Sequence, residues 1–208
     1  MVTRERRAAR MAPDDRRAAI IDATLPLVLE HGSGVSTRLI AEAADVAEGT
    51  IYRVFPDKDA LMCAVTEKAF DPEPTLAQLA AIDRQLPLRD RLVAAAVVMQ
   101  HRLVGAFVLI DALGLTGPPP GRQEARRVMN DAFHAALVDV VGPDEPALTV
   151  PAGELVHVLR LLVFSGSHPR ISDGRLLDAE QIVTILLDGV LARPGCRHHH
   201  AMTEDAAC

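Results

Sequence analysis

The stretch STRLIAEAADVAEGTIYRVFPDKDAL, from Ser36 to Leu61, decides the fold. Its pattern predicts two short helices joined by a tight turn and closed by an aromatic-Pro-Asp-Lys stop. Ser36 or Thr37 is placed to N-cap the first helix, because a hydroxyl there accepts a hydrogen bond from an N–H of the first turn. Asp45 stands where the turn requires a left-handed backbone. We interpret the stretch as a helix-turn-helix.

The apolar residues of this stretch are spaced to form a small core, made of Ala41, Val46, Ile51 and Phe55. Small Ala41 allows the two helices to cross closely, as a helix-turn-helix requires. The residues left outside carry hydrogen-bonding and cationic groups on a face narrow enough for the DNA major groove. They are Arg38, Glu48, Gly49, Thr50, Tyr52, Arg53 and Lys58. The sequence therefore predicts a DNA-reading module.

The unit from about Arg17 to Phe70 resembles the DNA-binding domain of the TetR family of bacterial transcriptional regulators. The resemblance rests on two segments, IIDATLPLVLEHG (Ile20 to Gly32) and STRLIAEAADVAEGTIYRVFPDKDALMCAV (Ser36 to Val65). It implies contacts to DNA phosphates by Thr37, Thr50, Tyr52 and Lys58. Three positions depart from the common pattern, namely Asp45 in place of Gly, Ala47 in place of a capping Ser, and Pro26 inside the first helix.

Four exposed positions are candidates for base contacts. Arg38 and Arg53 carry guanidinium groups suited to bidentate hydrogen bonds with guanine. Glu48 either accepts from a cytosine amine or stabilises the positive end of its own helix. Gly49 allows the backbone to approach the groove closely. The alternative for each is an ordinary solvated surface residue.

Charge supports DNA binding only locally. The chain of 208 residues has a formal net charge of −6, whereas DNA-binding proteins are often basic. Positive charge is concentrated in the first seventeen residues, as Arg4, Arg6, Arg7, Arg10, Arg16 and Arg17. Such an arm can neutralise phosphates or enter a minor groove, and the alternative is a solvated tail.

Length and patterning predict an all-α protein with four segments. We expect a flexible Arg-rich arm (1–16), a helix-turn-helix DNA-binding domain (17–70, called the reader domain here), a helical ligand-binding and dimerisation domain (71–194, called the bundle domain), and a disordered tail (195–208). The bundle helices are expected at Thr75–Arg84, Leu88–Leu115, Gln123–Val141, Gly153–Gly166 and Asp178–Ala192. The second of these is expected to be buried at the middle of the domain, because apolar residues cover two of its sides.

Composition limits where the protein acts. No hydrophobic run reaches the roughly 18 uncharged residues of a membrane span, because Gln100, His101 and Arg102 interrupt the longest candidate. No signal peptide is visible after the Arg-rich start. Cys63, Cys196 and Cys208 form no disulfide framework and suit a reducing cytoplasm. We therefore expect a cytoplasmic protein without membrane contact.

The last two helices carry more apolar surface than one small subunit can hide. A symmetric four-helix contact between two chains would cover it, and a homodimer is also what the resemblance implies. The alternative is that these residues form the core of the subunit itself. The expected interface residues are Leu155, Leu159, Leu162, Ile182, Leu186 and Val190.

A pocket between the long helix and its neighbours is the expected place for a small-molecule effector. Its candidate lining is Met99, Leu103, Phe107, Asp111, Phe133, His134 and His157, each of which is also a plausible core or surface residue. The supply of Val, Leu and Ala favours an apolar or acyl-like ligand. Histidines and cysteines in the tail lack the geometry of a closed metal site, so we expect no metal and no cofactor.

The sequence contains no GxxxxGK[ST], GxGxxG, HExxH or GxSxG motif, so no enzyme class is indicated. The favoured hypothesis is a homodimeric repressor that binds a near-palindromic double-stranded operator and is released by a small molecule. One alternative is a protein-interaction module with a vestigial reader domain. Another is a metal- or thiol-responsive regulator that uses the tail and Cys63.

Overall fold

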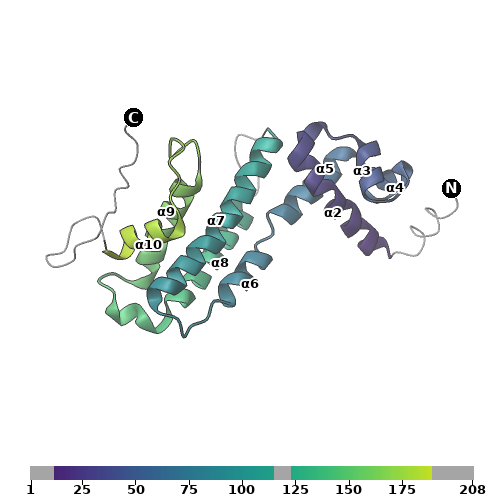
Figure 1. Cartoon of the computed structure of the whole chain (residues 1–208). Helices are drawn as coiled ribbons and strands as arrows, with labels where there is room; N and C mark the ends of the chain where they lie inside the picture. The colour runs from purple at the N-terminus through teal and green to yellow at the C-terminus, as the bar shows by residue number, and fades with distance from the viewer. Residues whose placement is uncertain (1–11, 115–122, 189–208) are drawn as a thin grey trace, which may run out of the picture.

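The computed structural model describes residues 12–114 and 123–188, and every regular element in those ranges is a helix (Figure 1). The reader domain contains α2 (Pro13–His31), the 3-10 turn η1 (Gly32–Gly34), α3 (Thr37–Ala43), α4 (Glu48–Val54) and α5 (Lys58–Ala69). The bundle domain contains α6 (Glu73–Ala80), α7 (Leu88–Ala112), α8 (Gln123–Val141), the 3-10 turn η2 (Gly142–Ala147), α9 (Ala152–Ser167) and α10 (Ala179–Asp188). The predicted all-helical fold is confirmed. The first helix begins inside the segment expected as an arm, and it continues through Pro26.

Local side-chain chemistry sets the helix ends of the reader domain. The Ser36 hydroxyl accepts a 3.2 Å hydrogen bond from the N–H of Leu39 and caps α3. Asp57 caps α5 in the same way, accepting from the N–H of Ala60 at 2.7 Å. Asp45 adopts the expected left-handed conformation, with φ of 52°. Ala47 precedes α4 without any side-chain cap, as its apolar side chain dictates.

Two hydrophobic cores hold the molecule together. The reader core contains the four residues predicted for the helix-turn-helix, together with residues of α2 and α5 such as Ile20 and Leu61. The bundle core is formed by α7, α8, α9 and α10, with Leu92, Phe133 and Ile182 among its buried residues. Leu109 of α7 belongs to the reader core, so this helix contributes to both cores.

Helix α7 is central but not buried all round. Its Leu92, Ala96 and Met99 are buried as the predicted seam requires. The expectation for its other side is wrong, because Val97, Val104 and Val108 are 38%, 46% and 48% exposed. The periodicity identifies an apolar face, whereas the neighbours of α7, which are α2, α6, α8, α9 and α10, leave that face uncovered in the single chain.

By length and composition, α7 is also the one helix among the described residues that could cross a membrane, with 25 residues and a mean hydropathy of 1.9. This differs from the expectation drawn from its polar residues. Two of those residues are engaged inside the fold, because the side chains of Gln100 and Arg102 donate hydrogen bonds to other segments. We interpret α7 as the core helix of a bundle, because core helices can be as long and as apolar as a helix that crosses a membrane.

The reader domain meets the C-terminal end of α7 at Gly32. This residue ends α2 with φ of 65°, a conformation that favours glycine. A Cβ added there would lie 2.7 Å from the backbone oxygen of Ala112. Glycine is therefore required twice, once for the turn and once for the close approach of the two domains. Figure 1 shows this end of α7 beside α2.

We predict that Gly32→Ala destabilises the protein by about 2 kcal/mol or more, since the left-handed backbone alone costs ~1–2 kcal/mol with a Cβ. Gly34→Ala is the matched control, because nothing lies within 4 Å of its added Cβ. Urea unfolding of both variants measures the difference. Equal unfolding midpoints would contradict the proposed steric requirement.

Candidate nucleic-acid interface and sensor sites

Three predicted contact residues form one network at the start of α3 and α4. The Thr37 hydroxyl donates to the Glu48 carboxylate at 2.6 Å, and the Tyr52 hydroxyl approaches the Thr37 oxygen at 3.5 Å. Tyr52 and Glu48 are exposed, so both groups also face solvent. The network joins α3 to α4 and fixes three polar groups on one surface.

Arg53 is held by its own helix. Its guanidinium donates to the Thr50 hydroxyl at 2.9 Å, while the rest of the side chain is exposed. The prediction that Thr50 faces outward is wrong, because Thr50 is only 4% exposed. Thr50 lies one position before core residue Ile51 and turns toward the same interior. Its hydroxyl therefore orients Arg53 rather than standing on the surface itself.

Of the remaining predicted contact residues, Arg38 and Gly49 are exposed, whereas Lys58 forms a hydrogen bond within the protein. Arg38 is exposed and lines a hollow of about 310 Å³ between α3 and α4, together with Ala41, Glu42, Val46 and Glu48. Gly49 is open, since nothing lies within 4 Å of its added Cβ. Lys58 donates to the backbone oxygen of Ser33 at 2.7 Å, which ties the start of α5 to η1.

One contact of the reader domain was not expected from the sequence. The guanidinium of Arg17, the first residue of the predicted reader domain, lies 4.5 Å from the centroid of the Phe55 ring. Arg17 is part of α2, so it stabilises the reader core through a cation–π contact. The remaining arginines of the predicted arm, except Arg16, lie outside the described residues.

Comparison with known proteins identifies the reader domain. Residues 20–65 match the model of the bacterial regulatory proteins of the tetR family. The reader domain is thus similar to the DNA-binding domain of the TetR family. A relative, the HTH-type transcriptional repressor KstR of Mycolicibacterium smegmatis, is 32% identical over 111 residues, which are 49% of this chain and 54% of KstR. The chain thus matches about half the length of that relative, and half or less of two other KstR proteins.

Two further matches extend over most of the chain. The HTH-type transcriptional regulator EthR of Mycobacterium tuberculosis is 25% identical over 190 residues, or 84% of this chain and 88% of EthR. The crystal structure of FadR from Bacillus subtilis in complex with stearoyl-CoA has the same fold, with a TM-score of 0.57. It is 15% identical, and the match covers 84% of this chain and 99% of that one. The relatives named here are transcriptional regulators.

The residues predicted for an effector pocket lie in several different surroundings. Met99 and Phe133 are buried in the bundle core, and Leu103 packs against that core. Phe107 lies in an aromatic cluster with Phe164 and His168, at centroid distances of 5.5 and 4.4 Å. The other three are placed apart: Asp111 pairs with Arg170 at 2.8 Å, His134 lies beside Gly153, and His157 is exposed.

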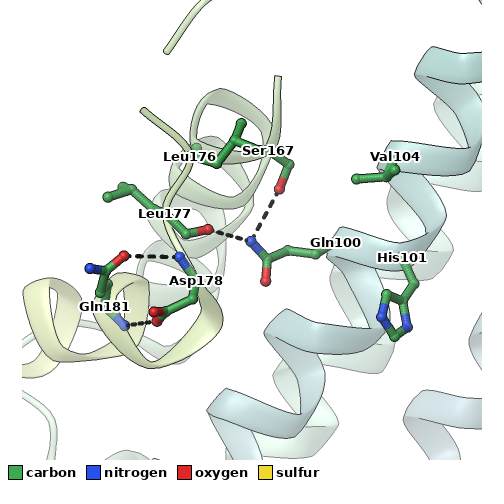
Figure 2. A pocket seen from close by; sticks show the side chains of 9 residues that line it. Gln100, His101, Val104, Ser167, Leu176, Leu177, Asp178 and Gln181 are labelled. Atoms are coloured by element: carbon green, nitrogen blue, oxygen red, sulfur yellow. Dashed lines mark hydrogen bonds between the residues drawn. The ribbon is translucent and has the colours of Figure 1, made fainter. Parts of the chain in front are cut away.

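A cavity of about 750 Å³ lies elsewhere, between α7, the end of α9 and the start of α10 (Figure 2). Its residues are Gln100, His101, Val104, Gly166, Ser167, Leu176, Leu177, Asp178 and Gln181. The Gln100 amide donates to the Ser167 hydroxyl at 3.2 Å and to the Leu177 oxygen at 2.8 Å. Asp178 and Gln181 cap α10 reciprocally. Their D-x-x-Q spacing in the sequence is typical of a helix start, and it is the local pattern that could have located this side of the cavity.

The predicted dimer residues fall into three groups. Leu155, Leu159 and Ile182 are buried in the core of the subunit itself, so a second chain cannot cover them. Leu162 and Leu186 pack partly against that core, and Val190 lies outside the described residues. The exposed apolar residues of the same helices are Val158, Leu161 and Phe164 on α9 and Ile185 on α10.

Proposed function

We propose that this TetR-family protein is a transcriptional regulator that binds a near-palindromic DNA operator as a homodimer. The observation that supports this most directly is the surface of α3 and α4, where Arg38, Glu48, Tyr52 and Arg53 are exposed together. The relatives KstR and EthR are named as transcriptional regulators, which supports the same proposal. Such a protein acts in the cytoplasm, where the DNA is, and needs no catalytic activity.

Repression is the direction that we propose, because KstR is named as a repressor. A protein-interaction module with a vestigial reader domain is the second candidate. A regulator that responds to metal is supported less, since no cluster of three metal-ligating side chains occurs within residues 12–114 and 123–188. The tail proposed for that role lies outside the described residues.

We predict that Arg53→Ala weakens operator binding by about fivefold or more, because one good base contact is worth ~1–3 kcal/mol. Tyr52→Phe removes one phosphate contact and should weaken binding alike for all sequences. The measurement is binding to DNA fragments that flank the gene, and to genomic fragments, over a salt series. Arg126→Ala, at an exposed position of α8, is the control. Absence of any specific site would favour the interaction module.

The homodimer is proposed to form through the exposed face of α9 and α10. Val158, Leu161 and Phe164 follow each other at helical spacing on α9, and Ile185 adds an apolar side chain on α10. In a symmetric contact of two such faces, each of these residues is buried in both chains and so contributes to the interface two times. Two reader domains would then face half-sites about one helical turn apart.

We predict that Leu161→Glu dissociates the dimer, because Leu161 is 54% exposed in the single chain and would be buried by the partner. The dissociation constant should rise by about a hundredfold or more, as two symmetric copies each lose ~1.5 kcal/mol or more. Sedimentation at several protein concentrations measures this. The control Val128→Glu places the same charge at an exposed valine of α8. Unchanged sedimentation of the Leu161 variant would refute this interface.

The effector is proposed to bind in the cavity lined by Gln100 and Gln181. Val104, Leu176 and Leu177 supply apolar walls, whereas amide, hydroxyl and carboxylate groups supply hydrogen bonds. This combination favours an amphipathic molecule with an apolar body and one polar end. An acyl thioester has that character, and stearoyl-CoA is a suitable first probe because FadR, which shares the fold, was crystallised with it.

We predict that stearoyl-CoA raises the melting temperature and lowers operator affinity, while coenzyme A alone does neither. Ligand binding stabilises by RT ln(1 + [L]/Kd), or about 2.7 kcal/mol at a hundredfold excess over Kd. Leu176→Glu places a charge in the apolar wall and should abolish both effects. If stearoyl-CoA still acts on that variant, the effector site lies elsewhere. If it acts on neither protein, the acyl class is wrong.

A further inference from the structure

Among the described residues, the reader and bundle domains contact each other at the end of α7 and at the α5–α6 junction. The first is apolar, where Leu109 and Leu113 at the end of α7 join the reader core. The second is polar, at the junction between α5 and α6, where the chain leaves the reader domain. One attachment point leaves the reader domain able to pivot, whereas two points fix its orientation. The side chain that makes the second attachment therefore controls that orientation.

Arg102 of α7 makes the polar attachment. Its guanidinium donates to the backbone oxygen of Phe70 at 3.0 Å and to that of Asp71 at 2.9 Å. Phe70 ends α5, so these carbonyls lie at the negative end of that helix, where a cation is favoured. A planar guanidinium can serve both carbonyls at once, whereas an ammonium lacks this forked geometry.

The same guanidinium also contacts the bundle core. It lies 4.7 Å from the centroid of the Phe133 ring, and it approaches the Met129 sulfur at 3.2 Å. Phe133 is buried in the bundle core, and both residues belong to α8. Burial lowers the pKa of Arg102, and the nearby Asp71 carboxylate partly offsets this effect. The group thus links α8, α7 and the end of α5 at a partly desolvated point.

We propose that Arg102 is the positioning residue that holds the reader domain in a fixed orientation on the bundle domain. This inference deepens the proposed function, because it names the link through which movement of α7 or α8 reaches the DNA-binding surface. Loss of the link leaves the apolar contact at the end of α7 and the peptide chain between α5 and α6 as the connections between the domains. The reader domain should then sample several orientations while both domains stay folded.

The test uses the full chain and needs neither DNA nor an effector. Spin labels are placed on Cys63 of α5 and on Glu180→Cys of α10, both exposed positions, with Cys196 and Cys208 replaced by Ser. Labelled chains are mixed with an excess of unlabelled chains, so that only the two labels of one chain report. Pulsed electron paramagnetic resonance then measures the distance between the two domains, whether the protein is a monomer or a dimer.

Arg102→Met keeps the apolar stem over Phe133 and removes the charge and the donors. We expect it to lose the single narrow distance peak of the unsubstituted protein and to give a broad distribution. Arg102→Lys, which keeps the charge without the planar fork, should fall between them and covers the case in which the Met variant fails to fold. Circular dichroism checks the folding of each variant.

Arg160→Met is the matched control. Arg160 is also partly buried, donates to the Asn130 backbone and side-chain oxygens at 3.3 and 3.1 Å, and links α9 to α8 without touching the reader domain. Its variant should keep the narrow peak. An unchanged peak in both Arg102 variants, or equal broadening in the control, would overturn the proposal. The distance measurement does not need DNA, so it still tests the role of Arg102 if the protein proves not to bind an operator.

Discussion

The structure depends on one helix that belongs to two hydrophobic cores. The N-terminal half of α7 supplies Leu92 and Ala96 to the bundle core, and its last turns supply Leu109 to the reader core. Because well-packed cores resist continuous deformation, a displacement of α7 must be accommodated by both domains. Gly32 permits this arrangement, since a larger residue would collide with the backbone of Ala112.

Arginines reinforce both ends of this shared helix. At the distal end, Arg91 is fully buried, donates to the Val141 oxygen at 3.2 Å and pairs with Asp144. Nearer the reader domain, Arg102 joins the end of α5 to Phe133. Both side chains satisfy backbone carbonyls at the ends of neighbouring helices, which the helices cannot satisfy themselves. Apolar packing thus positions α7, whereas Arg91 and Arg102 hold the ends of α8 and α5 against it.

The sequence predicted the reader domain well, because its rules are local. Ser36, Asp45 and Ala47 behave as their side chains dictate at a cap or a turn. It failed where burial depends on a distant neighbour, as for Thr50, the valines of α7 and the dimer residues that lie in the subunit core. Gln100, His101 and Arg102 were interpreted as one interruption, yet each residue turns about 100° from the last. Gln100 faces α9 and the start of α10, His101 is exposed, and Arg102 faces the α5–α6 junction.

The position of Gln100 bears on how an effector in the adjacent cavity would act. Its amide bridges Ser167 at the end of α9 and the Leu177 oxygen just before α10, so it holds both segments against α7. A ligand group that replaced these bonds would remove one polar link of α7 to α9 and α10, two residues before Arg102. To reverse a 99:1 equilibrium between two orientations, such a ligand must prefer one state by about 5.5 kcal/mol. Because Gln100, Ser167, Asp178 and Gln181 already form hydrogen bonds within the protein, a ligand that bonds to them exchanges existing bonds, and apolar contacts with Val104, Leu176 and Leu177 add the larger share of that preference.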